Sequence, residues 1–360
     1  MQLTHLRIEN LRLIEALDLD LSPGWNLFLG ANGAGKTSLL EAAFLLSHGR
    51  SFRGAARDAL TRRGTAGYAV YGELSKSNGS TERVGVARAG GRLEARLNRE
   101  SVPVGELMRH TAVSCFEPGS HELIAGASEQ RRRFLDWGVF HVEPSFLSDW
   151  RRYQRALRQR NALLRSGGDV AADLDAWDHE LASAAAPLTA MRLRYFAALQ
   201  PLLAELAREL LAELGEPRLQ FQPGFDAEQS LPDILASQRD RDRARGHTGA
   251  GPHRADWSVV FEAAPRREHL SRGQEKLCAF ACVMAQARLY AATAGEWPVI
   301  GIDDLAAEVD LDHQRKLLAV LAASGAQLLV TGTEESPALA AAGPSIARFH
   351  VEQGRVTRLL

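Results

Sequence analysis

The chain has 360 residues, 45% of them hydrophobic, and a formal net charge of −1, so it can hold two domains or one large domain with an insertion. The near-neutral balance excludes a uniformly basic nucleic-acid-binding protein, and any surface for phosphates must be local. Three cysteines, odd in number and without metal-ligand spacing, argue against a disulfide framework and favour a reducing compartment. The alternating N-terminus has no signal-peptide core, and no apolar run approaches the ~20 residues that span a bilayer. We therefore expect a cytoplasmic protein without a membrane partner.

The first predicted elements are two strands within residues 1–30, which lead into a complete phosphate-binding loop. Its glycines allow the backbone N–H groups to turn inward, and the N-terminus of the following helix adds partial positive charge. Lys36 can reach the β- and γ-phosphates, and the Thr37 hydroxyl can ligate Mg²⁺. The pattern predicts a nucleoside triphosphate site, with ATP and Mg²⁺ as ligands. The loop fits G-x-x-x-x-G-K-[ST] and continues into a helix-forming run that starts at Ser38, the last residue that we expect to bind ATP. It reads Gly30-Ala31-Asn32-Gly33-Ala34-Gly35-Lys36-Thr37.

Three regions follow one another along the chain. Residues 66–113 read as short strands with Gly-rich turns and predict an antiparallel β layer, which we group with the phosphate loop in residues 1–125. Residues 126–217 are almost continuously helix-forming, and the Gly167-Gly168 break divides them into two amphipathic stretches, as in a helical-hairpin arm. Residues 218–360 are expected to complete the domain that the phosphate loop begins.

An apolar run at residues 298–302 ends in two carboxylates, Asp303 and Asp304. This pattern predicts a strand that delivers the carboxylates opposite the phosphate loop. Asp303 would hold Mg²⁺ together with Thr37, and Asp304 would be catalytic by polarising the attacking water. Because most of the chain separates Lys36 from Asp303, the helical arm must be inserted between two halves of one nucleotide-binding head.

An S-x-G-Q motif, Ser271-Arg272-Gly273-Gln274, precedes a long predicted helix. A small hydroxyl, a glycine and an amide at a helix N-terminus can bind a phosphate, although Ser271 would also serve as an ordinary N-cap. The order of phosphate loop, S-x-G-Q and acidic strand is typical of ABC-type ATPases, in which the signature of one subunit completes the phosphate loop of another. Ala307-Glu308-Val309-Asp310 is similar to the D-loop of that class.

The whole chain resembles the RecF family of bacterial recombination mediators, which are ATPases related to SMC proteins. The resemblance implies an α/β fold: an ABC-type, SMC-like P-loop ATPase head with an antiparallel β layer and an inserted helical-hairpin arm. The chain departs from the family pattern at Glu129, at Ala307 and in the strand that contains Gly301. Beyond the ATPase motifs, the resemblance rests on the runs Ile8-Glu9-Asn10-Leu11-Arg12, Leu40-Glu41-Ala42, Arg50-Ser51-Phe52-Arg53, Arg131-Arg132-Arg133-Phe134-Leu135-Asp136 and Gly251-Pro252-His253-Arg254.

The resemblance also implies an activity and partners. The expected activity is slow ATP hydrolysis, with formation of a homodimer when ATP binds. The expected ligand is single-stranded and duplex DNA at gap junctions. The expected partners are RecR and RecO, with which the protein would place RecA on gapped single-stranded DNA. Two other functions stay open. One is an ABC-type subunit that energises a membrane transporter, against which the Arg-rich insertion argues. The other is a DNA clamp that binds ATP without functional hydrolysis.

Two local groups of arginines are candidate DNA contacts. The first group contains Arg50, Arg53, Arg57, Arg62 and Arg63. This local excess of positive charge predicts a surface that binds nucleic acid or a dimer partner. Because aromatic residues are sparse near both groups, we expect contact with the DNA backbone rather than with bases. For the arm, a solvated face or pairing with acids of the other helix is an equal alternative. The arm group begins with Arg131, Arg132 and Arg133 and continues at residues 151, 152, 155, 158, 160 and 165.

The run Gly251-Pro252-His253-Arg254 precedes a predicted strand and has two interpretations. It either forms a tight turn with a buried imidazole or contacts a nucleotide or an interface. The sequence alone leaves both open.

Overall fold

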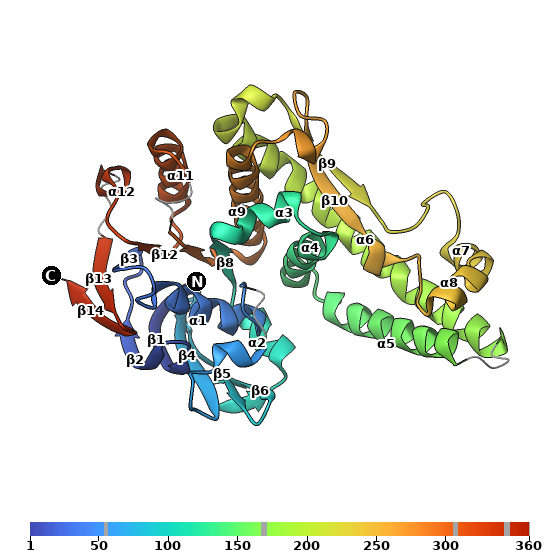
Figure 1. The fold of residues 1–360 in the computed structure, drawn as a ribbon, viewed down its shortest axis with the longest axis horizontal. Helices are drawn as coiled ribbons and strands as arrows, with labels where there is room; N and C mark the ends of the chain where they lie inside the picture. Colours follow the sequence, from blue (N-terminus) through green and yellow to red (C-terminus); the bar gives the residue numbers. More distant parts are fainter. Residues whose placement is uncertain (54–56, 167–170, 305–308, 342–345, 360) are drawn as a thin grey trace. The chain divides into compact units, whose positions relative to one another are not determined.

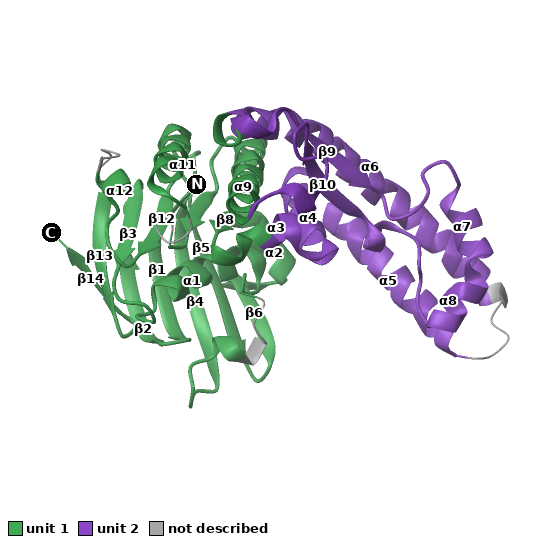
Figure 2. Cartoon of the chain, turned by 45° about the horizontal axis from the view of Figure 1, so that its top comes forward, with its two compact units in different colours: residues 1–121, 209–211, 272–360 green, residues 122–208, 212–271 purple. Residues whose placement is uncertain are grey.

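The computed structural model describes residues 1–53, 57–166, 171–304, 309–341 and 346–359 (Figure 1). The chain forms two compact units (Figure 2). Unit 1 consists of residues 1–121, 209–211 and 272–360, and unit 2 of residues 122–208 and 212–271. The phosphate loop and the acidic residues after the apolar strand both belong to unit 1, so the two halves of the predicted head do come together around an insertion.

The first sheet of unit 1 is mainly parallel, with the strand order β14-β13-β3-β12-β11-β8. Only β14 runs antiparallel to its neighbour. Every residue of β11 and β12 is buried, as expected for parallel strands that are covered on both faces. The strands are β3 (Trp25–Leu29), β8 (Val113–Phe116), β11 (Val299–Ile302), β12 (Leu328–Gly332), β13 (Ile346–Glu352) and β14 (Arg355–Leu359).

The second sheet of unit 1 is the antiparallel layer that the sequence predicted, with the strand order β2-β1-β4-β5-β6-β7. In β4, buried residues alternate with half-buried ones, so one face of the sheet packs inward. Helix α1 (Lys36–His48) lies between the two sheets, because it contacts β8 and β12 of one and β1 and β4 of the other. The strands are β1 (Gln2–Leu11), β2 (Ile14–Asp20), β4 (Gly67–Ser75), β5 (Thr81–Ala89), β6 (Arg92–Leu97) and β7 (Glu100–Val102).

Further helices complete unit 1. Helices α9 (Arg272–Ala294), α11 (Leu311–Ser324) and α12 (Pro337–Ala341) lie on the side of the parallel sheet that faces away from α1 (Figure 1). The expectation that no apolar run could span a bilayer is corrected for α9, the one described helix that is long and apolar enough, with a mean hydropathy of 1.3. Since 72% of that apolar window is buried, α9 has the character of a core helix. Shorter elements are α2 (Val104–His110), η1 (Arg57–Leu60) and η2 (Pro118–His121).

Unit 2 contains the predicted helical arm. Helices α5 and α6 lie side by side in Figures 1 and 2 and are the two amphipathic stretches, while the Gly167-Gly168 break between them is outside the described residues. Short 3₁₀ helices are η3 (Ala212–Leu214), η4 (Pro252–Arg254) and η5 (Arg267–His269). The main elements are α3 (Glu122–Ala125), α4 (Ser128–Val142), α5 (Phe146–Arg165), α6 (Ala171–Leu210), β9 (Pro217–Gln222), α7 (Leu231–Ser237), α8 (Arg239–Arg245) and β10 (Asp256–Phe261).

The expected domain boundary at residue 217 is corrected, because residues 212–271 cluster with the arm instead of the head. Aromatic packing explains this. The Phe196 ring of α6 lies 5.0 Å from Phe221 of β9 and 5.8 Å from Trp257 of β10, measured between ring centroids. Phe134 of α4 packs 5.4 Å from Trp257 on the same strand. The antiparallel pair β9–β10 therefore buries its apolar side chains against the arm helices.

Candidate nucleotide site and nucleic-acid surface

The phosphate loop joins β3 to α1, and its glycines have distinct steric roles. Gly33 (φ 80°) and Gly35 (φ 111°) lie in the left-handed region, which side chains disfavour. Gly35 is the N-cap of α1, so the first N–H groups of the helix have no intrahelical acceptor. At Gly30 the constraint is contact, since a Cβ atom there would lie 2.1 Å from the carbonyl oxygen of Val351.

Lys36 is held over this loop. Its side chain is buried, and its Nζ donates hydrogen bonds to the carbonyl oxygens of Gly30 at 2.8 Å and Ala31 at 3.1 Å. These carbonyls hold the ammonium group close to the unpaired N–H groups at the start of α1. The ammonium group and the backbone N–H groups, which are all positively polarised hydrogen-bond donors, therefore converge, as the binding of a phosphate chain requires.

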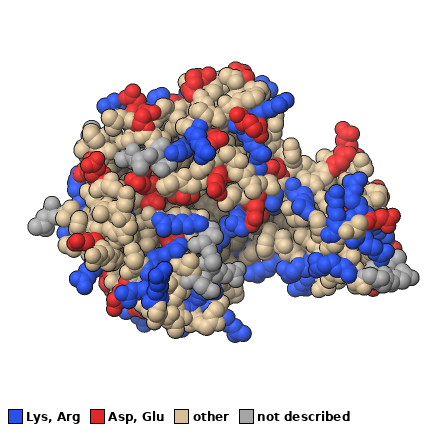
Figure 3. Space-filling view, in the orientation of Figure 1, with Lys and Arg blue, Asp and Glu red and all other residues tan. Residues whose placement is uncertain are grey.

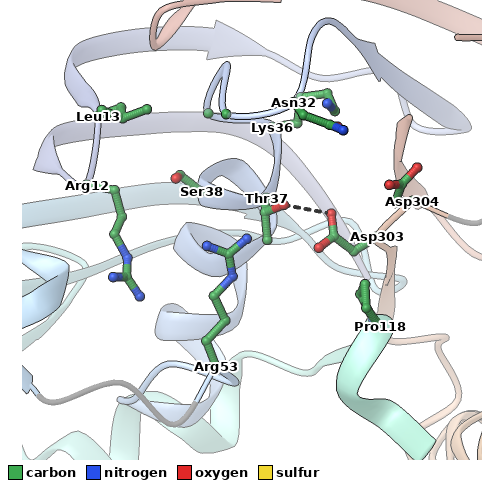
Figure 4. A pocket seen from close by; sticks show the side chains of 12 residues that line it. Arg12, Leu13, Asn32, Lys36, Thr37, Ser38, Arg53, Pro118, Asp303 and Asp304 are labelled. Atoms are coloured by element: carbon green, nitrogen blue, oxygen red, sulfur yellow. Dashed lines mark hydrogen bonds between the residues drawn. The ribbon is translucent and has the colours of Figure 1, made fainter. Parts of the chain in front are cut away.

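The predicted magnesium ligands lie next to each other. The Thr37 hydroxyl donates to Asp303 Oδ1 at 2.9 Å (Figure 4). The same oxygen accepts the hydroxyl of Thr331 at 2.6 Å. The described residues contain no cluster of three or more His, Cys, Asp or Glu side chains that could hold a metal ion. A hydroxyl and one carboxylate fit Mg²⁺ in a nucleotide site, because this ion keeps water and substrate phosphates as its other ligands.

Asp304 follows directly and adopts a left-handed backbone conformation with φ 53°. Its N–H group donates to Thr331, to the carbonyl oxygen at 3.2 Å and to the hydroxyl at 3.1 Å. Aspartate is among the few residues that tolerate this conformation, and such backbone strain is often found at functional sites. The bend at the end of β11 places Asp303 and Asp304 together at the edge of one cavity.

That cavity has a volume of about 410 Å³, within the range of small-molecule sites (Figure 4). It brings together eight of the predicted residues, while Gly30, Ala31 and Ala34 belong to the loop but do not line it. The sequence analysis assigned no nucleotide role to Arg12, Leu13 or Pro118, although Arg12 ended one of the runs that carried the family resemblance. Arg53 was predicted to contact DNA, but it lines the nucleotide cavity. The lining consists of Arg12, Leu13, Asn32, Gly33, Gly35, Lys36, Thr37, Ser38, Arg53, Pro118, Asp303 and Asp304.

The signature motif lies at the start of α9. Arg272 and Gly273 are exposed and Gln274 is half-buried, and none of the three lines the cavity. Ser271 is exposed just before the helix. Of the D-loop motif, Ala307-Glu308 lies outside the described residues, while Asp310 is the N-cap of α11 and accepts the N–H groups of Asp312 and His313 at 3.1 and 3.0 Å.

The arginines of residues 50–63 divide between different tasks. Arg53 is exposed and lines the nucleotide cavity. Arg62 pairs with Glu15 at 3.0 Å, whereas Arg50 and Arg63 are exposed on the surface. Arg57 begins η1, and its side chain lies outside the described part.

The arm group requires a correction, because two of its arginines are internal. Arg131 is 3% exposed, donates to Asp256 through Nε at 2.6 Å and Nη2 at 2.9 Å, and so cannot contact DNA. Arg160 is fully buried and pairs with Asp178 at 2.5 Å and Asp242 at 2.7 Å. Each buried arginine is paired with carboxylates of unit 2, as buried charges must be: Arg131 with half-buried Asp256, and Arg160 with the buried Asp178 and Asp242.

Two neighbours of Arg131 are also partly engaged. Arg132 is half-buried, and its Nη1 donates to the carbonyl oxygen of Ala255 at 2.9 Å. Burial lowers the pKa of Arg132. Arg133 is exposed and forms an ion pair with Glu129 one helical turn earlier. The surface available for phosphates is therefore elsewhere on the arm.

Exposed arginines of α5 form such a surface. Arg151, Arg155 and Arg158 are spaced four and three residues apart, so they lie on one face of the helix, and they form no salt bridge among the described residues. Figure 3 shows Lys and Arg side chains gathered on the visible face of unit 2. We call these three residues the α5 stripe.

The run 251–254 forms a tight turn, as in one of its two interpretations, and the imidazole of His253 within it is half-buried. The Tyr153 hydroxyl donates to His253 Nδ1 at 2.6 Å, and His253 Nε2 lies 3.0 Å from the Thr248 carbonyl oxygen. Burial lowers the pKa of His253 to about 4, so the ring is neutral and can hold both bonds. Gly251 is required because a Cβ atom would lie 2.6 Å from the Tyr153 hydroxyl.

A phosphate loop that leads into a helix between two sheets, paired carboxylates after a strand of the mainly parallel sheet, and an inserted helical arm together define an ABC-type P-loop ATPase head of the SMC kind. Residues 2–357 match the family described as "RecF/RecN/SMC N terminal domain". The fold is similar to an SMC head bound to the C-winged helix domain of ScpA, with a TM-score of 0.61, 14% identity, and coverage of 100% of this chain and 98% of the other.

More specific relatives are found at full length. The "DNA replication and repair protein RecF" of Xanthomonas euvesicatoria pv. vesicatoria (strain 85-10) is 50% identical over 364 residues, which cover 99% of each chain. The structure of "the recombination mediator protein RecF-ATP in RecFOR pathway" has the same fold, with a TM-score of 0.90, 24% identity, and coverage of 100% of this chain and 98% of the other. The chain belongs to the RecF family.

Proposed function

We propose that this chain is an ATP-dependent DNA-binding protein of recombinational repair, which dimerises when it binds ATP. The observation that carries the proposal is the contact between Thr37 and Asp303 beside a complete phosphate loop. The names of its relatives, which are DNA replication and repair proteins, support the repair role. The resemblance to the RecF family also supports RecR, RecO and RecA as its partners on gapped single-stranded DNA. The protein would then act in the cytoplasm and on the nucleoid.

The chemistry is slow ATP hydrolysis. Lys36 and the N–H groups of the loop hold the phosphates, and Thr37 and Asp303 would hold Mg²⁺, which neutralises the charge of the phosphate chain. Asp304 orients the attacking water and accepts its proton. ABC enzymes usually have Glu at this place, and the shorter Asp side chain activates water less well, so turnover is low.

Dimerisation completes the site. The signature consists of the exposed residues Ser271, Arg272 and Gly273 and the half-buried Gln274. In one subunit these residues contact the γ-phosphate held by the other, because a helix N-terminus and its free N–H groups favour an anion. Asp310 contributes from the D-loop. ATP therefore links two heads, and hydrolysis separates them.

DNA binds through exposed cations rather than through base recognition. On the arm, the α5 stripe supplies the phosphate contacts, and Arg50 and Arg63 supply others on unit 1. Each phosphate neutralised on duplex DNA releases counterions and adds about 0.9 to the slope of log affinity against log salt. Single-stranded and duplex DNA at a gap both offer this backbone.

Sedimentation velocity of the full chain tests the proposal, with a non-hydrolysable ATP analogue, Mg²⁺ and a short gapped DNA. We expect a monomer without nucleotide, a dimer with the analogue, and co-sedimentation of that dimer with DNA. The Lys36→Ala variant, which cannot hold the phosphates in this way, should stay monomeric. A wild-type chain that remains monomeric and free of DNA would show the proposal to be wrong. If the dimer forms and Asp304→Asn acts normally on DNA, the clamp without functional hydrolysis is favoured instead.

A further inference from the structure

Glu41 is a buried carboxylate beside the nucleotide cavity. It lies on α1 one helical turn after Thr37 and has no exposed surface. Arg12 donates to both of its oxygens, through Nε at 2.9 Å and Nη2 at 2.8 Å, and the Ser51 hydroxyl donates to Oε1 as well. A buried carboxylate needs such partners, and a bidentate guanidinium also fixes their geometry. None of the roles assigned above uses Glu41.

The two partners of Glu41 make further contacts, one to Arg53 and the other to Ala59 and Leu60. Ser51 Oγ accepts the N–H group of Arg53 at 3.0 Å. Arg12 donates through Nη1 to the carbonyl oxygen of Ala59 at 2.7 Å, and its backbone N–H donates to Leu60 at 2.8 Å. One carboxylate on the phosphate-loop helix is therefore linked, through Ser51 and Arg12, to residues 51–53 and to residues 59–60.

These contacts shape one wall of the cavity. In Figure 4 the side chains of Arg12 and Arg53 lie on one side of Thr37, and Asp303 and Asp304 lie on the other. Glu41 balances the charge of Arg12 and raises its pKa through their hydrogen bonds. Arg53 forms no ion pair within the described residues, so its guanidinium keeps its charge for an incoming anion.

We infer that Glu41 is a positioning residue of the nucleotide site. It holds Arg12 directly and the Arg53 segment through Ser51, so that a cationic wall faces the carboxylates before the triphosphate binds. Such preorganisation favours the ligand with more negative charge, because the guanidinium groups need not be reordered on binding. This inference rests on the proposed ATP site and concerns the selectivity of that site for ATP over ADP.

Calorimetric binding of a non-hydrolysable ATP analogue and of ADP to the full chain, both with Mg²⁺, tests this role. Glu41→Gln keeps the shape of the side chain and removes its charge. We expect the Kd for the ATP analogue to rise about tenfold and that for ADP to rise about threefold or less, so the selectivity ratio falls. A merely structural role would leave this ratio unchanged, because loss of folded protein lowers the number of sites for both ligands alike. Glu94→Gln, an exposed glutamate on β6, is the matched control and should bind as the wild type does.

A second variant keeps the test decisive if Glu41→Gln does not fold. Ser51→Ala should lower the selectivity ratio in the same direction by a smaller factor, and should add nothing in the Glu41→Gln background because both act through one carboxylate. An unchanged ratio in either folded variant would overturn the inference. Failure of the proposed function is distinguishable, since the wild type itself would then fail to bind the ATP analogue.

Discussion

The Thr37 hydroxyl donates to the Asp303 carboxylate at 2.9 Å, although 266 residues separate the two along the chain. The hydroxyl of Thr331, at the end of β12, donates to the same oxygen at 2.6 Å. Asp303 is 5% exposed, so this carboxylate is oriented by protein groups on two neighbouring elements. Strand order explains the meeting, because β12 lies between β3 and β11 in the parallel sheet.

Neutralising Asp303 and neutralising Asp304 should affect different steps, the first the Mg²⁺-dependent binding of ATP and the second its hydrolysis. Asp304→Asn should bind ATP normally and hydrolyse it about 100-fold more slowly, because the base is removed while the groups that hold the phosphates remain. Asp303→Asn should instead abolish the dependence of ATP binding on Mg²⁺, since an amide is a poorer ligand for this ion. Phosphate release at saturating ATP and binding titrations with and without Mg²⁺ separate the two effects.

Asp312→Asn is the matched control for these carboxylates. Its side chain is 83% exposed, and its one ion pair within the described part of the chain is with Arg315 at 2.7 Å, so hydrolysis and magnesium dependence should stay at wild-type values. Wild-type turnover by Asp304→Asn would show that another group activates the water.

A second prediction concerns the strand that departs from the family pattern. Gly301 lies in buried β11, and a Cβ atom there would lie 2.8 Å from the Cys115 sulfur on neighbouring β8. Gly301→Ala should therefore destabilise the chain by about 1–3 kcal/mol through overpacking. Adding Cys115→Ala removes the sulfur and should restore part of the stability, which a double-mutant cycle of thermal unfolding detects. Strictly additive effects would mean that Cys115 is not the obstacle.

The elements predicted from sequence are those that local patterns specify. The phosphate loop has fixed spacing between Gly30, Gly35 and Lys36, and its steric reasons lie largely within the loop. Short strands separated by Gly-rich turns predicted the antiparallel layer, because turn residues act within a few positions of one another. The proximity of Thr37 and Asp303 was expected because both were predicted to hold Mg²⁺, and that prediction depended on the order of the motifs along the chain.

Errors arose where the partner of a residue lies far away in the chain. Arg131 resembles a surface cation in sequence, but Asp256, 125 residues later, neutralises it in the structure. A count of arginines reveals charge and not burial, so Arg160 was grouped with the exposed arginines of α5. The boundary at 217 failed because the packing of Trp257 against Phe196 follows from tertiary structure rather than from any local pattern.

The third prediction is a loss of stability in acid that depends on His253. Burial lowers its pKa from 6.5 to about 4, and the charges of Arg254 and Arg132 act in the same direction. The unfolded chain therefore binds a proton between these pH values while the folded chain does not. Stability is at its full value above pH 6.5 and falls as the pH decreases towards 4, by up to about 3 kcal/mol from this group.

Melting temperatures between pH 4 and 7.5 measure this effect. His253→Gln should lower the melting temperature at pH 7, because it removes the hydrogen bonds to Tyr153 and Thr248, and should flatten the acid limb of the curve. His179→Gln is the control, since His179 is exposed on α6 and should leave the curve unchanged. An acid limb of equal slope in His253→Gln would assign the effect to other groups.

The last prediction separates arginines that stabilise the arm from those that bind DNA. Arg160→Ala leaves Asp178 and Asp242 buried without their shared cation and should cost about 3–5 kcal/mol. Thermal unfolding measures this decrease in stability. An Arg160→Ala variant as stable as the wild type would show that water or Arg239, which also pairs with Asp178 at 2.7 Å, compensates for the missing charge.

Substitutions in the α5 stripe should leave the stability of the arm nearly unchanged and should weaken DNA binding. Replacing Arg151, Arg155 and Arg158 together by Gln removes exposed charges, so the melting temperature should change by less than about 2 °C. Affinity for duplex DNA should fall, and the slope of log affinity against log salt should decrease by about 0.9 for each phosphate that the variant no longer neutralises. Arg133→Gln, which breaks only a local pair with Glu129, is the control and should keep most of the wild-type slope. An unchanged salt slope in the triple variant would place the DNA-binding surface on other residues, because counterion release reports neutralised phosphates whatever the DNA sequence.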